Sequence, residues 1–164
     1  MKKNKKGGFT LIEILVVIGI IAILATIVLI AINPARQFAQ SRDTQRQSNL
    51  NTILNAVGQR MADNKGIFAG TFTISGTTYT CGPIATAAAT AITTDMAADT
   101  TTLTGKLGCL VPTYIATLPT DPAGVTAPAT NYTISQDATT GRITVGTTVN
   151  EPSIPRTTAL TIVR

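Results

Sequence analysis

The chain has 164 residues, enough for one globular domain with additional segments. Its net charge is +5, but four of its 13 basic residues lie within residues 2–6, so the basicity does not indicate a nucleic-acid-binding protein. The sequence contains no histidine, which excludes histidine-based catalytic triads and imidazole metal sites, and it has no phosphate-binding glycine loop. We therefore expect a protein that is not an enzyme and that needs no cofactor and no metal.

The N-terminus combines a basic leader, residues 1–8, with a long apolar segment, residues 9–32. As a helix the apolar segment would span about 36 Å, enough to cross a hydrocarbon layer of ~30 Å. The leader lysines predict a single-pass membrane segment with a cytoplasmic N-terminus and an exported C-terminal part. A removable secretory signal peptide is the alternative, but residues 20–40 contain no A-x-A cleavage triplet.

The stretch KKGGFTLIEILVVIGIIAILATIVL resembles the class III signal of type IV prepilins and type II secretion pseudopilins, and the resemblance extends over roughly residues 2–65. It implies that a prepilin peptidase cuts between Gly8 and Phe9 and methylates the new α-amine of Phe9. It also implies an inner-membrane precursor that assembly machinery in that membrane polymerises with other copies of itself. The final location would be an extracellular pilus or a periplasmic pseudopilus.

Glu13 places a carboxylate inside the apolar segment, where a charge is costly and usually has a partner or a function. Cleavage before Phe9 creates a cation that the precursor lacks. We therefore expect Phe9 and Glu13 to be assembly residues, with the Glu13 carboxylate of one subunit neutralising the Phe9 ammonium of its neighbour and setting the register. The alternative is that Glu13 reaches the lipid headgroups and has no partner.

A second, amphipathic helix segment, residues 33–65, is expected to continue the first as one long helix. Gly19 and Pro34 are the expected kink positions, because glycine has low helix propensity and proline removes a hydrogen bond. Arg42 and Arg46 lie one turn apart, and they form either a charged belt that contacts neighbouring subunits or a solvated helix face. An apolar stripe that suits packing on a sheet follows, at Leu50, Ile53, Leu54, Val57 and Met61.

Residues 66–164 predict a globular, β-rich head, which makes the whole chain α+β and pilin-like: a long kinked helix packed on a small antiparallel sheet. Alternation predicts three or four short strands, with apolar positions at Phe72, Ile74, Tyr132, Ile134, Ile143, Val145, Leu160 and Ile162. The Ala/Thr-rich residues 85–104 are consistent with a helix or with a surface loop. Residues 118–124, LPTDPAG, predict a proline-punctuated turn.

Two chemical features of the head follow from these expectations. If the head is exported, an oxidising compartment favours a disulfide between Cys81 and Cys109, and two free buried thiols are the alternative. In the major pseudopilins a region related to this turn binds calcium, but here Asp121 is the sole acidic residue of the turn and Asp137 is the next along the chain. Calcium takes six to eight oxygen ligands, so we expect no calcium site.

The leading functional hypothesis is a structural subunit of a type IV pilus-like filament. The alternatives are a major pseudopilin of a type II secretion system, a pilin for DNA uptake or adhesion, and a single-pass anchored protein that never assembles. A nucleic-acid partner lacks support, because the head beyond Gly66 has only four basic residues, Lys106, Arg142, Arg156 and Arg164, against five acidic ones.

Overall fold

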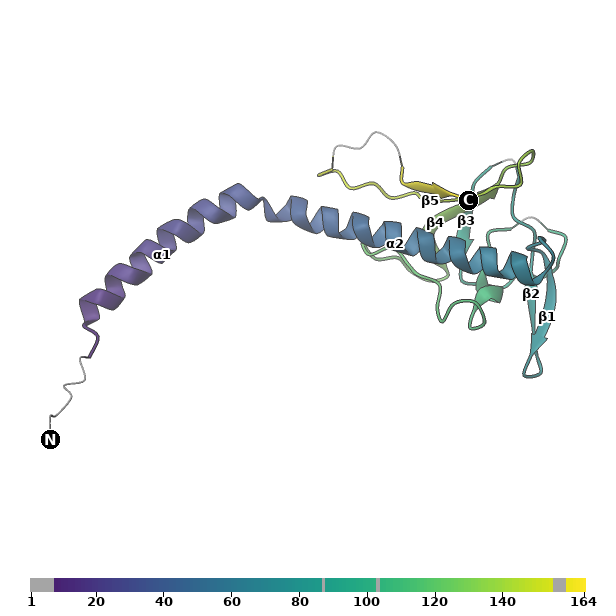
Figure 1. The fold of residues 1–164 in the computed structure, drawn as a ribbon, viewed down its shortest axis with the longest axis horizontal. Coiled ribbons are helices and arrows are strands. Elements are labelled where there is room, and N and C mark those ends of the chain that lie inside the picture. Colours follow the sequence, from purple (N-terminus) through teal and green to yellow (C-terminus); the bar gives the residue numbers. More distant parts are fainter. Residues whose placement is uncertain (1–7, 87, 103, 155–158) are drawn as a thin grey trace. The chain divides into compact units, whose positions relative to one another are not determined.

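The computed structural model describes residues 8–86, 88–102, 104–154 and 159–164. The leader lysines and the expected leader peptide therefore lie outside the described residues, apart from Gly8. The chain divides into two compact units: one extends to Phe38, and the other, called the head below, comprises Ala39–Arg164. The expected α+β layout is confirmed, with an apolar N-terminal helix in the first unit and a second helix packed on small antiparallel sheets in the head (Figure 1).

Helix α1 (Leu11–Ile32) is apolar along its whole length and continues through Gly19 without a break. It ends before Asn33, whose backbone is left-handed (φ 46°, ψ 79°), and helix α2 (Pro34–Asp63) begins at the next residue. Proline disfavours a helical conformation in the residue before it but fits the first position of a helix, where no donor is needed. Asn33 also caps α2, because its side-chain Oδ1 accepts from the Arg36 N–H at 3.3 Å. The long kinked helix expected from the sequence is therefore divided into two helices at Asn33 and Pro34.

The C-terminal end of α2 is closed by a left-handed turn. Lys65 has φ 55°, Gly66 has φ 88°, and the Gly66 N–H donates to the Met61 carbonyl at 2.7 Å. This six-to-one hydrogen bond is that of a Schellman motif, which satisfies a carbonyl at the helix end. Lys65 occupies the first left-handed position of this turn and Gly66 the second.

Within its described residues the head contains six strands in two antiparallel sheets. Strands β1 (Gly70–Ile74) and β2 (Thr77–Cys81) form a hairpin, and the four-stranded sheet has the order β3 (Thr90–Thr93), β4 (Ala129–Gln136), β5 (Ile143–Thr147), β6 (Thr161–Val163). The expectation of three or four strands was too low. The described residues of the segment 85–104, which exclude 87 and 103, contain β3 and no helix. The sequence signal was weak because Ile92 is the one buried side chain of that strand.

The core of the head joins the apolar stripe of α2 to one face of the four-stranded sheet. Fully buried side chains of α2 pack in one cluster with the inward side chains of β4 and β5, as the alternation predicts. They are Leu50, Ile53 and Val57 on the helix and Tyr132, Ile134 and Val145 on the sheet. The 3₁₀-helix η1 (Gly108–Leu110) is tied to β2 by the Cys81–Cys109 disulfide, with Cα atoms 5.5 Å apart. The expected bridge is confirmed.

Candidate processing and assembly site

The described residues before α1 are exposed, and the backbone of Thr10 is extended. Gly8, Phe9 and Thr10 have no regular secondary structure, and the Phe9 side chain is 85% exposed. Proteases bind their substrates in an extended form. The Gly8–Phe9 bond lies outside the helix, so it can be cut without unfolding α1. Phe9 is also one residue before the start of the helix cap, so a new amine there would lie at the helix N-terminus.

Thr10 and Glu13 form a reciprocal capping box at the start of α1. The Thr10 hydroxyl accepts from the Glu13 N–H at 3.3 Å, and the Glu13 carboxylate accepts from the Thr10 N–H at 3.0 Å and from the Thr10 hydroxyl at 2.9 Å. This arrangement satisfies two of the four free N–H groups of a helix N-terminus, and the carboxylate also lies at the positive end of the helix dipole. The sequence analysis missed it, although Thr10-x-x-Glu13 before an apolar run is the known signature.

The capping box leaves part of the Glu13 carboxylate available. Both hydrogen bonds that Glu13 accepts reach the same oxygen, Oε2, so within the described residues Oε1 remains open to another donor. A carboxylate held in this way is oriented before any second molecule arrives.

Helix α1 buries none of its side chains within its own chain. Its large apolar residues are between 50% and 83% exposed, and it is the one helix of the described residues that is long and apolar enough to cross a membrane. Its hydroxyl group is satisfied internally, since Thr26 donates to the Ala22 carbonyl at 2.9 Å. The helix surface therefore suits a lipid or an apolar protein environment.

The expected site residues Arg42 and Arg46 point into their own head. Arg46 is fully buried and donates through Nε and Nη2 to Asp121 at 2.6 and 3.0 Å, and through Nη1 to Glu151 at 2.7 Å. Arg42 also binds Glu151 through two hydrogen bonds, at 2.8 and 2.7 Å. Neither an intersubunit belt nor a solvated face describes Arg46, because its acceptors lie 75 and 105 residues away in sequence.

The same ion-pair network shifts the pKa values of Glu151 and Arg46. Hydrogen bonds from Arg42 and then Arg46 lower the pKa of the Glu151 carboxyl to about 2, and the acceptors hold the pKa of the Arg46 guanidinium above its ordinary value. Nearby, the buried Tyr132 hydroxyl accepts from Asn49 at 2.8 Å, and burial raises its pKa. The network fastens α2 to the turn at Asp121 and to the segment after β5.

The expected turn at residues 118–124 is stabilised by Asp121 itself, whose Oδ1 accepts from the Ala123 N–H at 2.8 Å. Asp137 accepts backbone N–H groups of Thr139 and Thr140, and these bonds lower its carboxyl pKa. Among the described residues there is no group of three or more histidine, cysteine, aspartate or glutamate residues that could hold a metal ion.

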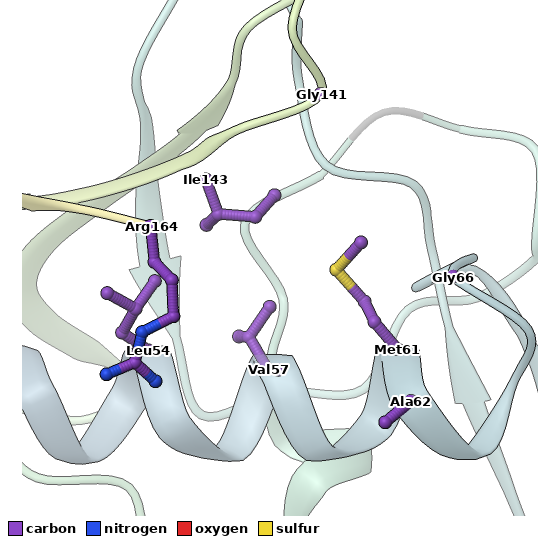
Figure 2. Close-up of a pocket in the computed structure, with 9 residues that line it drawn as sticks. Leu54, Val57, Met61, Ala62, Gly66, Gly141, Ile143 and Arg164 are labelled. Atoms are coloured by element: carbon purple, nitrogen blue, oxygen red, sulfur yellow. The ribbon is translucent and has the colours of Figure 1, made fainter.

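An open pocket of about 350 Å³ lies between α2 and the start of β5. Figure 2 shows Val57 and Met61 on the helix directed toward Ile143, with Arg164 at one side. The Arg164 guanidinium donates to the Asn55 side chain at 2.6 Å. Because the lining carries no carboxylate, hydroxyl or thiol side chain, the pocket offers apolar surface rather than acid–base chemistry.

The geometry at Phe9 and Glu13 agrees with a comparison to known families. A family model described as the prokaryotic N-terminal methylation motif matches residues 3–29. The chain carries the type IV pilin and pseudopilin signal. The match includes Gly8, Phe9, Glu13 and most of α1, and it does not extend to the head. No curated protein and no solved structure shows a significant match to the chain.

Proposed function

We propose that the chain is a structural subunit of a type IV pilus-like filament, cut between Gly8 and Phe9 by a prepilin peptidase, methylated on Phe9 and polymerised through α1. The observation that carries the proposal is an apolar helix that buries nothing in its own chain and begins at a cleavage and methylation signal. Such a helix needs other apolar surface, first the inner membrane and then neighbouring copies of itself. The cytoplasmic N-terminus and exported head of the precursor belong to this proposal.

Electrostatics assigns a role to Glu13 in this scheme. Cleavage puts the Phe9 ammonium at the positive end of the α1 dipole, an arrangement that costs about 0.3–1 kcal/mol at an exposed site. Methylation keeps that positive charge. An apolar bundle raises the cost of leaving the ammonium unpaired, and the open Oε1 of Glu13 on a neighbouring copy is a suitable acceptor. The pairing would favour one axial register between subunits.

Two variants separate the assembly role of Glu13 from its capping role. Glu13→Gln removes the charge but preserves the capping box, since glutamine caps as well, whereas Thr10→Ala removes the capping side chain and keeps the charge. We expect filament yield in electron micrographs to fall at least tenfold in Glu13→Gln and to stay within twofold of the unaltered chain in Thr10→Ala. Equal defects in the two variants would mean that Glu13 acts only as a cap.

Mass spectrometry of the mature protein tests processing independently of assembly. We expect an N-methylated Phe9 as the first residue in all three proteins. An intact leader in assembled material would refute the proposal as a whole.

The methylation signal is shared by pseudopilins, so the second candidate function is a major pseudopilin of a type II secretion system. Deletion of the gene distinguishes the two. A pilus subunit predicts loss of surface fibres with normal export, whereas a pseudopilin predicts loss of exoprotein secretion with no change in surface fibres.

A further inference from the structure

Arg60 is a buried cation in the last turn of α2, with only 4% of its surface exposed. Its Nε and Nη2 atoms have no hydrogen-bond acceptor within the described part of the chain. These two donors form one edge of the guanidinium, the edge that binds two oxygens of a carboxylate or phosphate side by side. A buried charge without a partner is unusual, because burial removes its hydration.

Two other arginines of the same helix show what this edge normally does. Arg46 directs Nε and Nη2 to the two oxygens of Asp121, and Arg42 directs the same pair of atoms to Glu151. In Arg60 the equivalent edge is buried and meets no carboxylate of the described residues. The helix therefore presents three arginines with the same two-donor edge, and in two of them this edge binds a carboxylate of the same chain.

The surroundings of Arg60 hold its guanidinium in place without neutralising it. The guanidinium lies 4.7 Å from the centre of the Phe72 ring, and Phe72 is in turn stacked on Tyr79 at 5.3 Å. This cation–π contact involves the ring face and uses none of the hydrogen-bond donors of the guanidinium. The nearby Asn64 amide does not serve as a counter-charge, since its nitrogen donates to the carbonyls of Ile67 and Ala69.

The backbone next to the Nε and Nη2 edge of Arg60 carries no side chain at position 70, which is a glycine. Gly70 has φ 137°, and a Cβ added there would lie 3.2 Å from Nη2 of Arg60 and 3.3 Å from the Asn64 amide nitrogen. A larger residue at position 70 would fill the space next to Nη2 of Arg60 and would have a strained backbone.

We propose that the Nε and Nη2 edge of Arg60 is a binding site for a small oxyanion that presents two oxygens, of the class of sulfate, phosphate or a simple carboxylate. Because the two donor atoms are themselves buried, a ligand reaches them only if neighbouring side chains shift, which favours a small free ion over a bulky ligand. The site is independent of filament assembly, because every residue that forms it belongs to one head.

Thermal unfolding of the full chain in neutral detergent, in a zwitterionic buffer, tests the site with sodium sulfate, sodium acetate and, at matched ionic strength, sodium chloride. Near-ultraviolet circular dichroism follows the head alone, since all three tyrosines lie there. For a bound ion we expect a rise of roughly 5 °C in Tm for each tenfold increase in sulfate above its dissociation constant. General salting effects instead vary linearly with concentration in every variant.

Three variants test whether the rise in Tm with sulfate depends on the Nε and Nη2 edge of Arg60. Arg60→Met and Arg60→Lys should both lose the logarithmic response, since methionine removes the charge and lysine keeps the charge without the two-donor edge. Arg142→Met, at an exposed arginine, should retain it. In chloride alone we expect Arg60→Met to melt no lower than the unaltered chain, because it removes an uncompensated buried charge.

An NMR titration gives a second readout. The Arg60 Nε–H signal should move with sulfate at the same midpoint as the melting curves. The same small linear rise in Tm for the unaltered chain and for Arg60→Met, with a stationary Nε–H signal, would overturn the proposal.

Discussion

The pairing of Arg46 with Asp121 gives the sharpest test of how the head is held together. Both side chains are fully buried, and Asp121 accepts two hydrogen bonds from Arg46 and one from the Ala123 N–H. Asp121→Ala would leave two buried Arg46 donors and the partly buried Ala123 N–H without an acceptor, while Glu151 still binds Arg46 through Nη1. Breaking a buried pair costs roughly 3–5 kcal/mol, and the remaining Glu151 contact places our expectation at about 3–4 kcal/mol.

For a head of this size, that loss corresponds to a fall in Tm of about 12–16 °C. Near-ultraviolet circular dichroism of the full chain in detergent measures it, and Asp95→Asn, at an exposed aspartate, serves as the matched control with an expected change within about 0.5 kcal/mol. The double variant Arg46→Met/Asp121→Ala should recover at least half of the loss, because no unpaired charge remains. The reasoning is refuted if Asp121→Ala costs less than 1 kcal/mol, or if the double variant is no more stable than the single one.

Two further predictions concern pH and the disulfide. The pKa of Glu151 is about 2 in the folded head, below its ordinary 4.5, so its stabilising contribution is complete above pH 4.5 and is lost as the pH falls toward 2. The Tm of the unaltered chain should therefore drop more steeply over that interval than that of Glu151→Gln, and parallel curves would contradict the assignment. Removing the bridge with the double variant Cys81→Ala/Cys109→Ala should cost about 3–4 kcal/mol by loop entropy for a separation of 28 residues. Urea unfolding measures this, and a reductant should lower the stability of the unaltered chain but not that of the double variant.

Patterns that act over a few residues were readable in the sequence. The stripe from Leu50 to Val57 and the alternation around Tyr132 and Val145 identified their buried faces, because side-chain direction follows directly from helix and strand periodicity. Strand β3 was not recognised, since four residues with a single buried side chain carry too little periodicity. The capping box at Thr10 and Glu13 is equally local and was predictable from the T-x-x-E pattern, but the prediction considered only the charge of Glu13.

The sequence by itself determined the processing signal, the apolar helix and the position of the helix break, because a peptidase motif, a membrane-length apolar run and a proline act through neighbouring residues. Only the tertiary structure decided the partners of the arginines on α2. Arg46 meets Asp121 and Glu151, and Arg60 meets the ring of Phe72, while its Nε and Nη2 atoms meet no acceptor of the described residues. These contacts depend on which distant segments the fold brings to each turn of the helix. The spacing of charges along the sequence does not indicate which distant residues will pair.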